Sequence, residues 1–157
     1  MKADRNGLDI LERPECLELL GQCTLGRVAI SVGALPTILP INFRLIDGHV
    51  VFRTGVGSKL DAATRGAVIA FEVDDFDAVD HTGWSVVVTG IAQESPASEW
   101  AGPIMSSAIP RWAPAGASRI LFLPTDIVSG RRITRERAVP APAPAPASAT
   151  ATAGARA

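Results

Sequence analysis

The pattern of hydrophobic and polar positions predicts one helix near the start of the chain and a series of strands after it. In the helix, Leu19 and Leu20 supply apolar positions, and Asp9 is the candidate N-cap. Pro14 is tolerated there only in the first turn or at a break, and Gly21 lies near the expected end. The later apolar runs predict strands at 25–32, 37–46, 49–54, 68–73, 84–92 and 119–128.

Turn-forming residues separate these strands. Gly33 and Ala34 close the first one. Asp47 and Gly48, placed between two apolar runs, are a strong signal for a tight hairpin. Before the strand at 84–92 we expect an acidic loop, which contains Asp74, Asp75, Asp77 and Asp80.

The remaining elements decide the fold class. Short helices are expected at 58–65 and beginning at 95–99, where Ser95 is the candidate cap. The total is about six strands and three short helices. Because the strands follow one another along the chain, the pattern favours a mainly β fold. We expect an antiparallel β-barrel with helical caps, in preference to a sheet of alternating strands and helices.

Length and composition predict one folded domain and a tail. The 157 residues are enough for one domain with a core and too few for two. From 138 onward nearly every residue is Ala, Pro, Ser or Thr, which blocks helix formation and offers nothing large to bury. We therefore expect a folded domain at 1–137 and an extended or disordered tail at 138–157.

Charge and cysteine content limit the partners and the compartment. The net charge of −1 provides no overall basic field, which argues against nucleic acid and anionic membranes as partners. No apolar run approaches the ~18 residues of a membrane span, and the start of the chain lacks the apolar core of a secretory signal. Cys16 and Cys23 are expected to be buried thiols in a reducing compartment, so the cytoplasm is the expected location.

The segment at 52–60 contains the features of a phosphate site. A strand carries Arg53 and Thr54 into a turn with two glycines, and the turn carries Ser58 and Lys59 to a helix start. Cations, hydroxyl donors, backbone amides and the positive end of a helix all favour a bound phosphate. Only two lysines occur beside thirteen arginines, and one of them is Lys59. An ordinary solvated turn before a helix remains the alternative interpretation.

Two common phosphate motifs are excluded at this segment. A nucleoside-triphosphate loop requires glycine before its lysine, where this chain has Ser58. The dinucleotide fingerprint requires a third glycine, where this chain has Leu60. Elsewhere, no spacing typical of metal ligands occurs and no glycine pattern of a nucleophile elbow surrounds a serine. The sequence therefore assigns no catalytic side chain and no metal site.

Six segments together carry a resemblance to a known family. They are Leu-Gly-Arg-Val-Ala at 25–29, Leu-Pro-Thr-Ile-Leu-Pro-Ile-Asn-Phe at 35–43, Phe-Arg-Thr at 52–54 with Gly-Ser-Lys-Leu at 57–60, Phe-Glu-Val-Asp at 71–74, Gly-Trp-Ser-Val-Val-Val-Thr-Gly at 83–90 and Gly-Arg-Arg-Ile at 130–133. In this order and spacing they resemble the pyridoxamine 5′-phosphate oxidase-like family, especially its small actinobacterial-type and nitroimidazole-reductase-like members. The resemblance implies an FMN-binding split β-barrel.

The resemblance also implies which residues bind the cofactor. The second strand would line the flavin ring through Thr37, Pro40, Ile41 and Asn42. Arg53 and Thr54 would contact the ribityl chain and phosphate, Ser58 and Lys59 would bind the phosphate, and Ser85 would reach the ring from the fifth strand. A homodimer with the flavin at its interface is implied as well. From their residue types alone, Asn42 would be a satisfied strand-end amide and Ser85 a small polar strand residue.

Several functions remain open at this stage. The leading hypothesis is an FMN-dependent oxidoreductase that exchanges hydride between flavin N5 and a small organic substrate. A deazaflavin-dependent reductase on the same fold, a non-enzymatic flavin- or haem-binding sensor or storage module, and a barrel with an empty cleft are the alternatives. Pyridoxamine-phosphate oxidation itself is disfavoured, because no histidine follows His81 where those oxidases carry an Arg-x-His motif. Ser58 also stands where they place a second cation.

Overall fold

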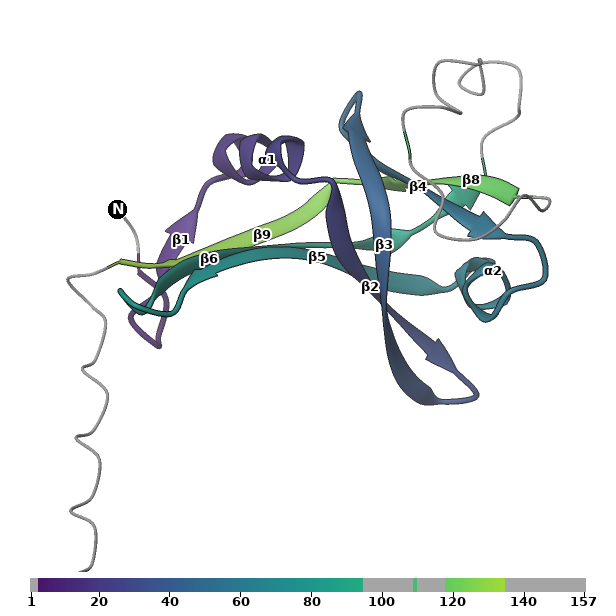
Figure 1. The fold of residues 1–157 in the computed structure, drawn as a ribbon, viewed down its shortest axis with the longest axis horizontal. Coiled ribbons are helices and arrows are strands. Elements are labelled where there is room, and N and C mark those ends of the chain that lie inside the picture. Colours follow the sequence, from purple (N-terminus) through teal and green to yellow (C-terminus); the bar gives the residue numbers. More distant parts are fainter. Residues whose placement is uncertain (1–2, 95–108, 110–117, 135–157) are drawn as a thin grey trace, which may run out of the picture.

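The computed structural model describes residues 3–94, 109 and 118–134 (Figure 1). These residues form nine strands and two helices: β1 (Asp9–Leu11), α1 (Arg13–Gln22), β2 (Leu25–Val32), β3 (Leu35–Ile46), β4 (His49–Gly55), α2 (Lys59–Thr64), β5 (Val68–Asp77), β6 (Thr82–Ile91), β7 (Gln93–Glu94), β8 (Ser118–Pro124) and β9 (Ile127–Ile133). The predicted helix starting at 95–99 and the predicted tail at 138–157 lie outside the described residues.

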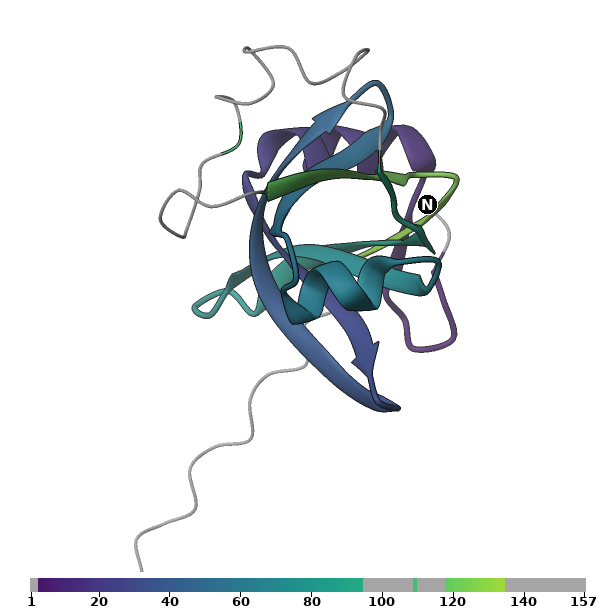
Figure 2. The ribbon, with the colours of Figure 1, turned by 90° about the vertical axis from the view of Figure 1, so that its right-hand side faces the viewer.

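All the strands join one antiparallel sheet in the order β1-β9-β6-β5-β2-β3-β4-β8-β7. The sheet curls into a half-barrel, which Figure 2 shows from its end. Helix α1 packs against β9 and β3, and α2 packs against β2 and β4. The mainly β, barrel-type fold is thus confirmed, with more strands than the six expected. Within the described ranges, no helix has the length and apolar character that a bilayer span requires.

Local signals placed several elements correctly. Strand β2 has the predicted bounds, and Pro14 lies in the first turn of α1. The hairpin between β3 and β4 turns at Asp47 and Gly48, whose φ angles of 46° and 74° are both left-handed. This conformation is the one that a two-residue hairpin of the Asp-Gly type requires. The helix expected at 58–65 forms as α2, with Ser58 as its N-cap.

Three expectations were wrong at the ends of elements. Asp9 does not cap α1; it belongs to β1 and is 1% exposed, and Glu12 holds the N-cap position. The expected acidic loop is mostly strand, because the β5–β6 ladder continues to the pair Asp77–Thr82. The last predicted strand is two strands, β8 and β9, separated by a turn at Thr125. The backbone N–H of Thr125 donates to the carbonyl oxygen of Gly48 (3.2 Å), which carries the β4–β8 pairing one residue past Pro124.

The inner face of the curled sheet contains the core. Phe43, Phe52 and Phe71 are fully buried, and the rings of Phe43 and Phe71 meet edge to face with centroids 4.7 Å apart. Packing here leaves no spare room beside β2. A Cβ at Gly26 would lie 2.3 Å from the Phe71 ring and 2.8 Å from the Glu72 carbonyl oxygen. Gly26 is therefore required by the close approach of β5.

The outer face of β9, β6, β5, β2 and β3 points away from this core. Residues directly opposite each other on paired strands share a face, so the register defines one continuous outer row: Ile38, Ala29, Ala70, Thr89 and Ile127. Ile38 and Ile127, at the two ends of the row, are each 66% exposed. The outer row thus has small side chains in its middle and large exposed apolar ones at its ends.

Candidate cofactor site

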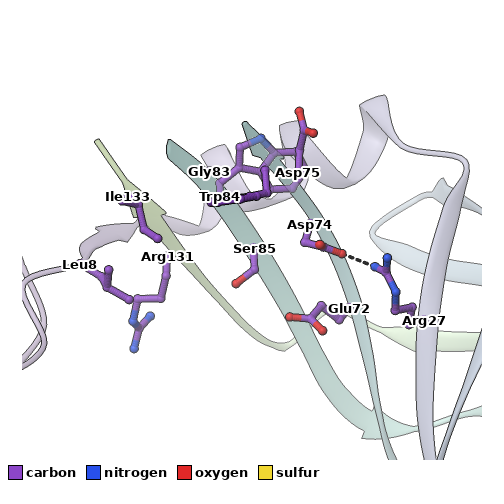
Figure 3. A pocket seen from close by; sticks show the side chains of 11 residues that line it. Leu8, Arg27, Glu72, Asp74, Asp75, Gly83, Trp84, Ser85, Arg131 and Ile133 are labelled. Carbon is purple, nitrogen blue, oxygen red and sulfur yellow. Dashed lines mark hydrogen bonds and ion pairs between the residues drawn. The ribbon is translucent and has the colours of Figure 1, made fainter. Parts of the chain in front are cut away.

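The predicted site residues lie at two places on the molecule. Ser85 lies in a pocket of about 500 Å³ at one end of the outer face (Figure 3). Its lining consists of Leu8, Arg27, Glu72, Asp74, Asp75, Phe76, Gly83, Trp84, Ser85, Arg131 and Ile133. Three of these residues are held by ion pairs: Arg27 contacts Asp74, and Arg131 Nε lies 3.0 Å from Asp4 Oδ2.

The other predicted residues lie on β3, β4 and α2, and one chain does not bring Ser85 to them. Strand β6, which carries Ser85, is three strands from β3 in the sheet order. At ~4.8 Å per strand the separation is about 14 Å. Ser85 of one chain is therefore too far away to share a hydrogen-bonded site with Asn42 of the same chain.

On β3 and β4 the predicted residues divide between the two faces of the sheet. The β3–β4 ladder ends at the pair Phe43–Phe52, and Asn42 and Arg53 are the next residue on each strand. Both are partly exposed, as is Thr37, and Pro40 is exposed. Ile41 and Thr54 instead point inward and are only 7% and 3% exposed. Thr37, four residues before Ile41 on the same strand, lies on the inner face as well, opposite the buried Ile30. From Ile41, only the backbone is available to a ligand on the outer side.

The turn between β4 and α2 has a defined backbone conformation. The N–H of Ser58 donates to the carbonyl oxygen of Gly55 (3.1 Å), which closes a four-residue turn. Gly57, at the third position, has a φ of +76°, a conformation that favours glycine. Among the described residues, no atom lies within 4 Å of a Cβ placed at Gly55 or Gly57, so this part of the chain leaves the space over the turn open.

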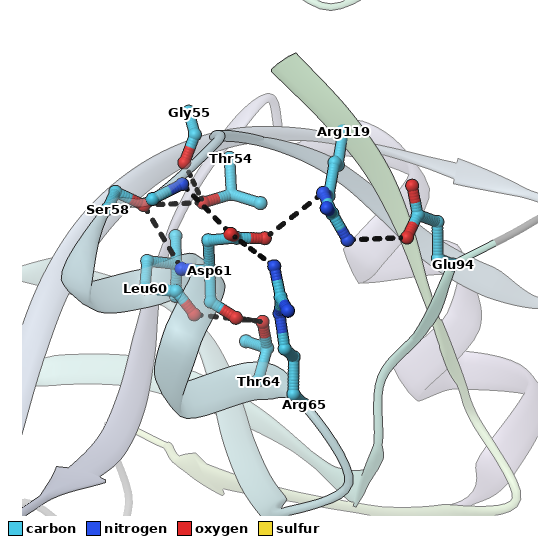
Figure 4. A network of polar contacts seen from close by, with 10 residues as sticks. Thr54, Gly55, Ser58, Leu60, Asp61, Thr64, Arg65, Glu94 and Arg119 are labelled. Atoms are coloured by element: carbon cyan, nitrogen blue, oxygen red, sulfur yellow. Dashed lines mark hydrogen bonds and ion pairs between the residues drawn. The ribbon is translucent and has the colours of Figure 1, made fainter. Parts of the chain in front are cut away.

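The hydroxyl groups of Thr54 and Ser58 form a polarised pair (Figure 4). Ser58 Oγ accepts from the backbone N–H of Asp61 (3.0 Å) and lies 2.9 Å from Thr54 Oγ1. Either hydroxyl can be the donor in this pair, and the Gly55 carbonyl oxygen, 3.5 Å away, is a weaker acceptor for Thr54. When Thr54 donates to Ser58, both acceptor positions of Ser58 are filled and its own proton can donate to a ligand.

Asp61 organises this turn, and the sequence analysis did not identify it. Its side chain is 3% exposed, and its Oδ2 accepts from the Gly57 N–H (3.0 Å) and from Arg65 (3.0 Å), while Arg119 Nε lies 3.6 Å from Oδ1. The Gly57 hydrogen bond, followed by the two arginines, lowers the pKa of Asp61 below its ordinary value in spite of burial. The Ser-Lys-Leu-Asp sequence at 58–61 resembles a capping box, which was the available signal.

These contacts change one detail of the expected phosphate site. From the sequence, the amides of the glycine turn are expected among the phosphate donors. The N–H groups of Gly57 and Ser58 are already bonded, to Asp61 and to Gly55. These two amides would therefore not bind a phosphate, and the Ser58 hydroxyl takes a larger share of the expected donors. The donor set and the open space still fit a phosphate group.

The cysteines and possible metal ligands add no second site within the described chain. Cys16 and Cys23 are free thiols, as expected, with Cys16 buried and Cys23 partly buried. Burial raises the pKa of both thiols, so neither is an activated nucleophile. Among the residues that the structure places, no group of three or more His, Cys, Asp or Glu side chains is arranged to hold a metal ion.

Comparison with known proteins connects this geometry to a family. The chain is 36% identical over 135 residues to Rv0080 of Mycobacterium tuberculosis. The match covers 83% of this chain and 88% of Rv0080. A FAD-binding protein from Mycobacterium smegmatis is similar in structure, with a TM-score of 0.69 and 31% identity over 80% of this chain and all of the other.

A FAD- and haem-binding protein from M. smegmatis shares the fold, with a TM-score of 0.61 and 18% identity over 76% of this chain and 70% of the other. The family model for pyridoxamine 5′-phosphate oxidase matches residues 12–132, which include every described strand except β1 and the last residue of β9. The protein belongs to the pyridoxamine 5′-phosphate oxidase-like family of flavin-binding split barrels.

Proposed function

We propose that this protein binds a flavin nucleotide by its phosphate at the junction of β4 and α2 and acts as a flavin-dependent oxidoreductase. The observation that carries the proposal is the Ser58 hydroxyl, which accepts from the Asp61 N–H and is paired with Thr54 Oγ1. When Thr54 donates in that pair, the Ser58 hydroxyl is left to donate, which suits an anion. The FAD-binding protein at 31% identity supports a flavin as the ligand.

In this proposal the ligand is FMN, and each predicted residue has a separate task. Ser58 donates to the phosphate, and Lys59, the first residue of α2, supplies the cation that offsets its charge. Arg53 and Asn42 lie toward the ribityl chain and the edge of the ring. The bound flavin supplies hydride transfer at N5, and the protein orients a small organic substrate against it.

A second copy of the chain completes the site in this proposal. Ser85 cannot reach the ring bound to its own chain, because three strand spacings separate it from β3. The outer row between the two places has exposed isoleucines at its ends and alanines in its middle. A two-fold dimer over this row would cover the exposed isoleucines and bring Ser85 of the partner toward the ring. The free thiols suit the cytoplasm as the compartment.

FAD is a second candidate for the ligand. The M. smegmatis protein at 31% identity is a FAD-binding protein, and its whole length is covered by the match. FAD differs from FMN by an additional phosphate and adenosine beyond the same riboflavin phosphate. The open space over Gly55 and Gly57 leaves an exit for that extension. The phosphate contacts proposed above are the same in both cases.

The test is cofactor identification followed by titration. Protein purified in full length should absorb in the flavin bands and release FMN, or FAD for the second candidate, on denaturation. Lys59→Ala should then weaken FMN binding by about 10- to 100-fold, the value of one charged hydrogen bond, and leave riboflavin binding unchanged. Lys2→Ala, at the only other lysine of the chain, is the matched control. Equal FMN affinity in the wild type and Lys59→Ala, or a haem Soret band in place of flavin absorption, would overturn the proposal.

A further inference from the structure

The buried carboxylate of Asp61 joins the turn before α2 and the end of α2 to a strand that is distant in sequence. It accepts from the Gly57 N–H in the turn and from Arg65 at the end of α2, and it faces Arg119 on β8. Arg119 in turn donates to Glu94 on β7 (2.9 Å). The carboxylate thus fixes the turn to the helix on one side and to the wall of the barrel on the other (Figure 4).

The backbone of the same residue fixes the hydroxyl that points to the ligand. The N–H of Asp61 fills one acceptor position of Ser58 Oγ, and the Gly57 contact holds the residue just before Ser58. Asp61 therefore holds the turn from two adjacent positions. Without these contacts, the turn and the Ser58 hydroxyl would be free to take other orientations, since Gly57 itself restricts the backbone little.

A carboxylate beside a phosphate site would ordinarily repel the ligand, and the chain offsets that repulsion. Two guanidinium groups face Asp61, from Arg65 at 3.0 Å and from Arg119 at 3.6 Å. These arginines serve the carboxylate of Asp61, so they are not counted among the cations for the ligand. The two arginines offset the negative charge of Asp61, so the main effect of Asp61 on the phosphate site is on the shape of the turn.

We propose that Asp61 is a positioning residue for the flavin phosphate: it holds the 55–58 turn so that the Ser58 hydroxyl donates to the phosphate. The proposal rests on the phosphate site proposed above. It states that Asp61 sets the preference of the protein for a phosphorylated flavin over riboflavin. Asp61 has no contact with the ring, so the affinity for the ring does not depend on it.

The test compares FMN with riboflavin in the wild type, Asp61→Asn and Thr64→Val. Asn keeps the size of Asp and removes the charge that binds both arginines. We expect Asp61→Asn to lower the ratio of the riboflavin Kd to the FMN Kd by about 10-fold, the value of one charge-assisted hydrogen bond, with riboflavin affinity unchanged. Thr64→Val is the matched control, because this buried hydroxyl bonds only to the Leu60 and Asp61 carbonyls among the described contacts.

The outcomes separate this inference from the proposed function. A ratio in Asp61→Asn equal to the wild-type ratio would overturn the positioning role, and a higher ratio would show that Asp61 only repels the phosphate. If Asp61→Asn does not fold, Arg119→Gln replaces it, with an expected drop of about 3-fold, for the loss of one partly exposed partner. A wild type that binds FMN and riboflavin equally would overturn the phosphate site itself, and this inference with it.

Discussion

The inner and outer faces of β9, β6, β5, β2 and β3 are formed by alternate residues of the same strands. On the inner face, Val28, Phe71 and Val88 are fully buried by other parts of this chain. On the outer face, Ile38 and Ile127 are 66% exposed although their side chains are as apolar. Strands that are apolar on both faces are typical of sheets covered on both sides. The chain thus completes one face itself, and in the proposed dimer a second copy would cover the other.

The largest effect is expected from a substitution on the inner face. Gly26→Ala places a methyl group 2.3 Å from the Phe71 ring and 2.8 Å from a backbone oxygen, so β2 and β5 must separate. We expect the free energy of unfolding to fall by about 3 kcal/mol in urea titrations.

Gly21→Ala is the matched control, because a Cβ there meets only a Leu45 methyl carbon at 3.9 Å. In helix α1 the same change should be neutral or stabilising by up to about 1 kcal/mol. If Gly26→Ala were as stable as the wild type, the inner face would have space for a methyl group at Gly26, and the close packing against Phe71 would be contradicted.

A charge in the middle of the outer row tests the other face. Ala70→Arg should leave the fold intact and weaken self-association by about 100-fold, because a guanidinium would be buried against its own copy. Sedimentation or light scattering over a concentration series measures the change. Val79→Arg, at an 87% exposed position in the β5–β6 turn, should associate like the wild type. A dimer that persists in Ala70→Arg would mean that the outer row is not the interface.

A smaller effect is expected where the partner reaches the ring. Ser85→Ala should weaken FMN and riboflavin alike, by about 3- to 10-fold, the value of one hydrogen bond. The ratio of the two dissociation constants should stay constant, in contrast to Lys59→Ala. Ser129→Ala, on the exposed part of β9, is the matched control. A change in that ratio would place Ser85 near the phosphate and contradict its proposed position.

The parts of the fold that sequence predicted are those that neighbouring residues determine. Asp47 and Gly48 define their hairpin by their own backbone preferences, and Ser58 caps the helix that begins one residue later. The phosphate segment was found for the same reason, since its residues lie within ten positions of one another. Its family assignment followed from the order of short motifs and was confirmed.

The parts that sequence missed depend on contacts between distant residues. The 119–128 run divides because its first part, β8, pairs with β4, whereas β9 pairs with β6 and β1. The partners of Asp61 include Arg119, which no local pattern relates to it. The aspartates at 74–77 join a strand because β6 pairs with them, in spite of their weak strand preference. The separation of Ser85 from Asn42 likewise appears only when the strand order is known.

The smallest effect is expected at the pocket end of the outer face, where Asp4 holds Arg131. Hydrogen bonds from the Leu8 and Asn6 amides, with Arg131, lower the pKa of Asp4 below its ordinary value of 3.8 in spite of partial desolvation. A carboxylate with a lowered pKa stabilises the fold above its unfolded-state pKa, and this contribution is lost as pH falls through the folded-state value. Wild-type stability should therefore fall below about pH 4, and the fall should be smaller in Asp4→Asn.

Unfolding free energies measured between pH 6 and pH 2 check this expectation. Asp126→Asn, at an exposed position in the β8–β9 turn, is the control and should follow the wild type. Since Asp61 has a lowered pKa as well, part of the acid loss should remain in Asp4→Asn. Identical pH profiles for Asp4→Asn and the wild type would mean that Asp4 does not fix Arg131 in solution. The Arg131 side chain would then be no more fixed in position than the exposed isoleucines of the outer row.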